Sequence, residues 1–366
     1  MNTQIRYPRN IIVRKLLVSL GRLILPLLAR IETRGLHLLP KQGPAILAGN
    51  HENIIEVVLM AVYSPALVEF IGTGDVPIDA RFAWLAKLYQ FIPIKRGNVD
   101  RTAIYTALDV LKAGGVIGIF PQGGIWGADV KSGRSGVGLL SHFSGAPVYP
   151  IGFGGLRGAL AKIMRFQRPR LTMRVGNPVQ ISSKGKESAL DKEELERFSS
   201  LVMERITELL PAEEKNGLRK SQENFDVEVF VQKNGYASHA LLELDLITRN
   251  GLGILFHYPV LLNTLKRNLG LPVGCLQNFG QPVPVRDVEL ALLAMLNYLE
   301  KDNPGFFTYR FGVDQGLIIK NALTRLKSMA LDYGEDAYFV FTPIYEYSEN
   351  GQVITMRGND SLHPLV

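Results

Sequence analysis

A histidine and a carboxylate five residues apart are the residues of this sequence best placed to do acid–base chemistry. His51 directly follows an apolar run at 44–49, and Glu56 comes about one helical turn after it. A neutral imidazole can take a proton from a hydroxyl when an acceptor such as a carboxylate holds its other ring nitrogen. We therefore interpret His51 as a general base oriented by Glu56. The alternative is an ordinary helix start, in which Asn50 caps the helix and His51 lies on the surface.

The elements around this pair follow the pattern of an α/β sheet. Residues 44–49 are expected to form a buried strand, and apolar residues at helical spacing follow from Ile55. Residues 91–97 are expected to form an apolar strand that ends in cations, and Asp100 to cap the next helix. Further buried strands are expected at 116–120 and 146–153. Because open α/β sheets bind ligands at the carboxyl ends of their strands, His51, Arg96 and Gln122 are expected to face one pocket.

Four short motifs lie in or after these strands. They are Asn50-His51 with its acid at Glu56, Phe-Ile-Pro-Ile-Lys-Arg at 91–96, Phe-Pro-Gln-Gly at 120–123 and Ala-Pro-Val-Tyr-Pro at 146–150. In this order they resemble the motifs of the lysophospholipid (1-acylglycerol-3-phosphate) acyltransferase family, over about residues 35–211. The resemblance implies a mixed α/β sheet flanked by helices, and transfer of a fatty acyl group from a thioester to a lipid hydroxyl.

The resemblance also implies a role for each matching residue. His51 becomes the general base and Glu56 its acid partner, while Arg96, next to Lys95, binds the phosphate of the acceptor. Gln122, Gly123 and Gly124 shape the acceptor site, and Asn50, Phe120 and Pro121 support it. The donor is acyl-CoA or acyl carrier protein, and the acceptor is a lysophospholipid, 1-acylglycerol-3-phosphate or a related lipid. No metal and no resident cofactor is expected.

Three positions depart from the family pattern. Glu56 stands where the family usually has Asp, so a shift of the backbone or the ring must absorb one extra methylene. Gln122 stands where the family usually has Glu, which keeps an acceptor oxygen but loses the charge. Gly124 is followed by Ile125-Trp126 where the family commonly has Thr-Arg, so an arginine is lost. This favours an acceptor that depends less on a phosphate monoester, unless Lys131 or Arg134 replaces the lost cation. A non-catalytic lipid- or thioester-binding protein on the same fold, or an acyl-CoA thioesterase, are the alternatives.

The N-terminal segment, 1–34, is expected to be an amphipathic helix on a membrane surface. Residues 1–31 hold six basic and no acidic residues, interleaved with Leu, Ile and Val. The longest uncharged stretch, 23–29, is far shorter than the ~20 residues that span a bilayer, and Arg22 interrupts any signal-peptide core. We expect the cytoplasmic face of a membrane, since Cys275 is the only cysteine. The alternative is a helix packed on the protein's own core.

Charge is distributed unevenly along the chain. Residues 1–211 hold 27 basic and 16 acidic residues, whereas the remainder holds 14 and 18. The basic part favours anionic lipids and the phosphates of CoA, or an acidic carrier protein. No nucleic-acid partner is expected, because no helix-turn-helix, zinc or aromatic-basic signature accompanies the charge. Walker, dinucleotide-binding and GxSxG motifs are also missing from the sequence.

The sequence predicts two folded domains, an acyltransferase domain at 35–211 and an α+β accessory domain at 225–366. A polar linker at 212–224 joins them. The second domain is expected to hold a strand from Phe225, helices near 239–248, 285–301 and 316–333, and a hairpin over 337–356. It could dock a carrier protein, form a homodimer or cover the acyl chain, and its helices could equally serve packing alone.

Overall fold

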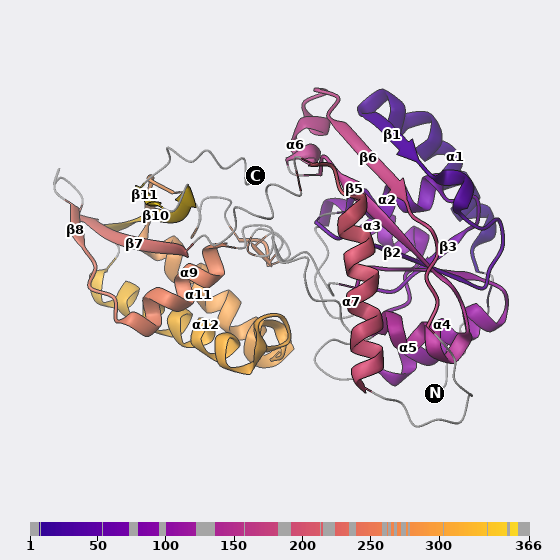
Figure 1. Ribbon diagram of the computed structural model, residues 1–366. Helices are drawn as coiled ribbons and strands as arrows, with labels where there is room; N and C mark the ends of the chain where they lie inside the picture. The colour runs from indigo at the N-terminus through magenta and orange to yellow at the C-terminus, as the bar shows by residue number, and fades with distance from the viewer. Residues whose placement is uncertain are drawn as a thin grey trace. The chain divides into compact units, whose positions relative to one another are not determined.

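The computed structural model describes two separate units of the chain (Figure 1). It describes residues 7, 9–52, 54–72, 80–94, 100–121, 136–156, 158–181, 192–212, 214, 224–233, 239–257, 262, 265–266, 269–271, 276, 279–302, 304–334, 336–349 and 352–357. Residues 1–74 and 83–219 contact one another and form unit 1, and residues 75–82 and 220–366 form unit 2. The domain bounds expected from the sequence stay a prediction.

Unit 1 is built on a mixed sheet. Its described strands are β1 (Arg30–Arg34), β2 (Ala45–Gly49), β3 (Val68–Phe70), β4 (Val116–Ile119), β5 (Val148–Gly154) and β6 (Arg170–Val175). They lie in the order β1-β6-β5-β2-β4-β3, parallel throughout except where β5 meets β6. The mixed sheet expected from the sequence is therefore confirmed. β2 is hydrogen-bonded on both edges and buried along its whole length, as in parallel sheets covered on both faces.

Helices cover both faces of this sheet. They are α1 (Ile11–Leu28), α2 (Ile55–Tyr63), α3 (Ala80–Tyr89), α4 (Arg101–Lys112), α5 (Gly136–Ser144), α6 (Ala159–Met164) and α7 (Lys192–Leu209), with a 3₁₀ turn η1 at Leu36–Leu38. Ile46 and Ala48 of β2 pack with α4, α5 and α7, while Ala45 and Leu47 pack with α1, α2, α3 and α6. The alternation of side chains along a strand thus divides the core into two layers.

The segment at 91–94 differs from the expected strand. Only Ile92 pairs there, accepting from Gly72 N–H and donating to the Phe70 carbonyl beside β3. Pro93 lacks the N–H that a further strand on the opposite side of this segment would require, so the segment can serve only as an edge of the sheet. The next helix is as expected, because Asp100 Oδ1 accepts from Ala103 N–H at 3.1 Å and Gly114 follows α4 at φ +73°.

Helix α1 packs on α2 with an unexpected face. Arg14 and Val18 are buried and Gly21 lies so close to Val62 that a Cβ would overlap it. The opposite face carries exposed apolar side chains: Ile12, Leu16, Leu20, Leu23 and Leu27. The helix expected over 1–34 ends at Leu28, because Arg30–Arg34 form β1, and the burial of α1 follows an ion pair of Arg14 rather than its leucines.

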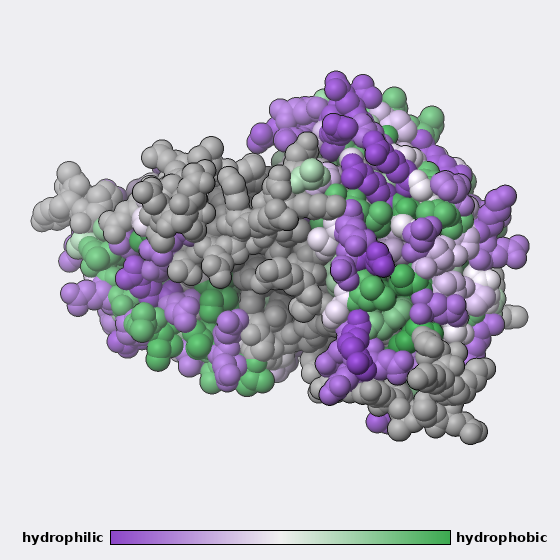
Figure 2. Space-filling view, viewed as in Figure 1, coloured by the Kyte–Doolittle hydropathy of each residue, from purple (hydrophilic) through white to green (hydrophobic). Residues whose placement is uncertain are grey.

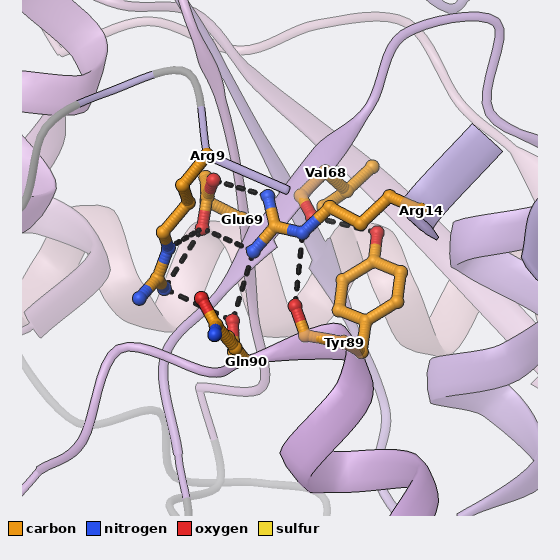
Figure 3. Close-up of polar contacts among 6 residues, drawn as sticks. All are labelled: Arg9, Arg14, Val68, Glu69, Tyr89 and Gln90. Atoms are coloured by element: carbon orange, nitrogen blue, oxygen red, sulfur yellow. Dashed lines mark hydrogen bonds and ion pairs between the residues drawn. The ribbon is translucent and has the colours of Figure 1, made fainter. Parts of the chain in front are cut away.

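That ion pair joins α1 to β3 and to the end of α3 (Figure 3). Arg14, 1% exposed, forms a bidentate pair with fully buried Glu69, with Nη2 2.8 Å from Oε2. The same guanidinium donates to the carbonyl of Tyr89, the last residue of α3, at 2.9 Å and to that of Gln90, the next residue, at 2.8 Å. Arg9 adds a second cation to Glu69 at 3.0 Å. One buried carboxylate therefore fixes three segments.

Tyr89 completes this cluster. Its hydroxyl donates to the Val68 carbonyl at 2.8 Å, and the Arg14 guanidinium lies 4.7 Å from its ring centroid. Burial raises the pKa of Tyr89 well above its usual range, so the hydroxyl stays a donor.

Unit 2 pairs an antiparallel sheet with helices. Its described strands are β7 (Asn224–Lys233), β8 (His239–Leu241), β9 (Pro282–Pro284), β10 (Ala337–Glu349) and β11 (Gln352–Arg357). They lie in the order β11-β10-β7-β8, with β9 also on β10. The described helices are α9 (Leu246–His257), α11 (Val285–Asn297) continued by a π turn η2 (Tyr298–Asp302), and α12 (Phe306–Tyr333). Val227, Val229 and Val231 alternate inward as expected, and the β10–β11 hairpin closes between Glu349 and Gln352.

Two helix predictions in unit 2 need correction. Residues 239–241 form a strand instead of a helix, because Leu241 pairs with Phe230 of β7 and this tertiary pairing overrides the local pattern. The helix expected from residue 316 begins ten residues earlier, at Phe306.

The buried ion pair leads to a prediction on stability. Glu69→Gln removes the charge that compensates buried Arg14, so we expect the free energy of unfolding to fall by about 3–5 kcal/mol. Glu32→Gln, which breaks the exposed pair with Arg170, is the matched control and should cost about 1 kcal/mol or less. Urea unfolding of both variants measures the difference, and equal losses would contradict a stabilising role for Glu69.

Candidate active site

The candidate site lies where β2 and β4 end. Ala48 of β2 pairs with Ile119 of β4 in parallel register, so the residues after both strands leave the sheet at the same edge. These residues are His51 and Phe120. Their rings stack with centroids 4.3 Å apart and planes inclined by 20°.

His51 is held by Glu56. Nδ1 of the ring lies 2.7 Å from Glu56 Oε1, so the contact expected from the sequence is made even with the longer Glu side chain. The His51 side chain is 16% exposed, whereas Glu56 is fully buried. Because a carboxylate only accepts hydrogen bonds, Nδ1 carries the proton of a neutral ring and Nε2 carries its lone pair. The alternative of a surface histidine is therefore wrong.

The start of α2 stabilises this carboxylate. Glu56 lies in the first turn of α2, and its Oε1 also accepts the backbone N–H of Glu52 at 2.5 Å. The positive end of a helix dipole and a backbone donor both favour an ionised carboxylate. Glu56 Oε1 is therefore held by the Glu52 N–H and by the His51 ring, although no part of the Glu56 side chain reaches solvent.

Asn50 fixes the backbone directly before His51. Its side-chain amide donates to the Phe153 carbonyl at 3.0 Å and accepts from Phe153 N–H at 2.8 Å. The buried amide thus adds one rung to the β2–β5 ladder, which ends at Gly49 and Ile151. Asn50 is consequently not a helix cap, and the residue before α2, Ile54, caps it with no side-chain bond.

Other expected site residues lie outside the described part of the chain. These are Lys95, Arg96, Gln122, Gly123 and Gly124, together with Ile125, Trp126, Lys131 and Arg134. Pro121 is described and is buried beside Phe120. The expected convergence of His51 with Arg96 and Gln122 stays a prediction.

Two contacts of this site had no clear signal in the sequence. The stacking of His51 on Phe120 depends on β2 and β4 being neighbours, and the bond from Asn50 to Phe153 spans 103 positions. Among the described residues, no group of three or more His, Cys, Asp or Glu side chains could hold a metal ion.

Part of this chain is similar in sequence to known proteins. Residues 30–154, which include His51, Glu56 and Phe120, match the family model described as Acyltransferase. The chain is 22% identical over 189 residues to the 1-acyl-sn-glycerol-3-phosphate acyltransferase of Bacillus subtilis (strain 168), covering 51% of this chain and 92% of that relative.

A solved structure is also similar. It is the crystal structure of the 1-acyl-sn-glycerophosphate (LPA) acyltransferase PlsC from Thermotoga maritima, at 19% identity and a TM-score of 0.40, over 57% of this chain and 80% of that chain. From the family match and the curated relative, residues 30–154 are an acyltransferase domain, and this protein is an acyltransferase enzyme.

Proposed function

We propose that this enzyme transfers a fatty acyl group from an acyl thioester to a hydroxyl of a lysophospholipid, with His51 as general base. The observation that carries the proposal is the 2.7 Å bond between His51 Nδ1 and buried Glu56, which leaves the lone pair of the ring on Nε2. A base in this tautomer can take a hydroxyl proton at neutral pH.

The reaction requires one proton to move twice. His51 Nε2 takes the proton of the acceptor hydroxyl as its oxygen attacks the thioester carbonyl carbon. The carbon–sulfur bond then breaks, and the imidazolium returns the proton to the departing thiolate. The products are an ester and a free thiol, and Glu56 stabilises the imidazolium that forms in between.

The acceptor class rests on the relatives and on the basic second motif. The relative from Bacillus subtilis is named a 1-acyl-sn-glycerol-3-phosphate acyltransferase, which supports an acceptor of that kind. Arg96, with Lys95 beside it, would bind the acceptor phosphate through charge-assisted hydrogen bonds. Backbone N–H groups near Gly123 and Gly124 would stabilise the developing oxyanion, with Gln122 facing the acceptor. Acyl-CoA and acyl carrier protein are both suitable donors.

A lipid acceptor fits the exposed face of α1. Along one face of this helix lie the exposed side chains of Ile12, Leu16, Leu20, Leu23 and Leu27. Trp84 and Leu88 are exposed on α3. Together with the basic N-terminal segment, they suit an anionic membrane surface. In the described part of the chain, no helix is long and apolar enough to cross a membrane.

The first prediction from this proposed function concerns His51. We expect His51→Ala to lower kcat by about 10²- to 10⁴-fold, because the base is lost while the acceptor site remains. His37→Ala, which removes an exposed histidine of η1, should leave kcat unchanged. Mass spectrometry of the ester formed from palmitoyl-CoA or acyl carrier protein and a panel of lysophospholipids measures both. Thiol release without any acceptor would indicate a thioesterase, and no turnover with either donor would indicate a binding protein.

A second prediction separates Glu56 from a structural role. Glu56→Gln can donate its amide N–H to Nδ1, which moves the ring proton to Nε2, so we expect kcat to fall by up to about 10⁴-fold. Glu56→Asp keeps the charge and the direction of the hydrogen bond and should lose much less. Similar losses for both variants would contradict the tautomer argument.

A third prediction concerns the membrane face of α1. Leu20→Ser with Leu23→Ser should weaken binding to vesicles containing phosphatidylglycerol by about 10²-fold, because two side chains no longer enter the lipid. Leu290→Ser with Leu293→Ser removes two exposed leucines at the same spacing on α11 and is the matched control. Sedimentation with vesicles measures both, and equal effects would refute the assignment. Point substitutions are preferable to deletion of α1, because deletion also removes buried Arg14.

A further inference from the structure

The turn after α6 contains an unusual aromatic residue. Phe166 N–H donates to the Ile163 carbonyl at 3.0 Å, and Gln167 N–H donates to the Lys162 carbonyl at 2.9 Å. These two bonds form a Schellman motif, in which the residue after the helix cap adopts a left-handed conformation. That residue is Phe166, at φ +57°.

Helix α4 ends in the same motif and provides an internal comparison. There Gly114 N–H donates to Leu111 and Gly115 N–H donates to Val110, and the left-handed residue is Gly114. Glycine is the usual residue at this position, because a side chain is disfavoured in the left-handed region. At the end of α6, a phenylalanine occupies the position at which glycine would be more stable.

Packing within the protein does not compensate for this strain. Phe166 is 80% exposed, and Met164 two residues earlier is 62% exposed. A strained residue that stays in place is a reason to look for a function. Since Phe166 buries little surface in the protein, a contact that favours phenylalanine at this position would involve another molecule or a lipid surface.

The charges around this turn indicate the chemistry of that contact. Lys162, Arg165 and Arg168 are all exposed, and residues 158–169 contain no acidic residue. Figure 2 shows hydrophilic side chains gathered over α6, β1 and β6 at the upper edge of unit 1. An exposed apolar tip ringed by cations is typical of segments that enter an anionic lipid interface.

The turn also adjoins the proposed membrane face. Arg168, itself at φ +46°, donates from Nη2 to the carbonyl of Pro26 in α1 at 2.9 Å. Leu23 and Leu27, next to Pro26 along α1, are exposed. In Figure 1, the turn between α6 and β6 lies beside α1 at the same end of unit 1. The exposed residues of the turn therefore extend the apolar surface of α1.

We propose that the turn at 164–168 is a second membrane anchor, in which Phe166 enters the lipid interface and Lys162 and Arg165 bind anionic head groups. This inference rests on the proposed membrane location of the enzyme. The lipid surface is favoured over a protein partner because the turn continues the apolar face of α1 and its exposed charges are all positive.

The first test measures vesicle binding of the full chain. Phe166→Ala should weaken binding to vesicles of phosphatidylcholine with phosphatidylglycerol by about tenfold. Phe143→Ala removes an exposed phenylalanine of α5 and should leave binding unchanged. Replacing Lys162 and Arg165 by Gln should weaken binding by about fivefold per charge, and only when phosphatidylglycerol is present. Unchanged binding of Phe166→Ala would overturn the anchor, as would an equal loss for Phe143→Ala.

A second test uses the strain itself. Phe166→Gly should raise the Tm by about 2 °C, because glycine adopts the left-handed conformation without strain, while vesicle binding falls. Phe166→Trp should retain binding and show more quenching by brominated lipids than the wild-type protein does. A fall in Tm together with intact binding for Phe166→Gly would overturn the inference.

A third measurement separates this inference from the proposed function. With donor and acceptor in detergent micelles, Phe166→Ala should form ester at the wild-type rate, because the turn is placed outside the catalytic machinery. If the wild-type protein binds neither to phosphatidylcholine vesicles nor to vesicles that also contain phosphatidylglycerol, both the anchor and the membrane location are overturned. Absence of ester formation by the wild-type protein in micelles would instead count against the proposed reaction.

Discussion

The parallel pairing of β2 with β4 on one side and β5 on the other is the constraint on which the site depends. It brings the carboxyl ends of three strands to one edge, which places His51 against Phe120 and Asn50 against the backbone of Phe153. The buried amide of Asn50 fixes the chain before His51, and Glu56 fixes the ring after it. His51 is thus held on both sides by groups that solvent hardly reaches, and such preorganisation would lower the cost of reaching a reactive geometry if His51 acts as the proposed base.

A second constraint is the compensation of buried charge. Glu69 lies on the edge strand of the sheet and accepts hydrogen bonds from Arg14 of α1 and from Arg9 in the segment before α1. This pairing decides which face of α1 is buried and so leaves its leucines outside. The helix is therefore part of the acyltransferase unit and also offers it an apolar surface. One face of α1 thus packs on the enzyme core, and the proposed attachment to lipid would use the opposite face.

Local patterns predicted much of unit 1 because most of its signals are local. Asp100 as a helix cap, the buried strands β2, β4 and β5, and the contact of His51 with Glu56 all involve residues close together in the sequence. The errors came where a distant partner decided the outcome. Arg14 is buried because it pairs with Glu69, which lies 55 residues away in the sequence. Residues 239–241 form a strand because they pair with β7.

The sequence by itself determined the residue types of the candidate site and their order, and the resemblance of its four motifs to an acyltransferase family indicated the class of reaction. Tertiary structure decided which groups surround His51 and Glu56, because strand order and the burial of Asn50 depend on contacts across 103 positions. It also decided the exposure of α1 and of Phe166. Helical periodicity identifies an apolar stripe, but only the packing of the whole unit determines whether that stripe faces the core or the solvent.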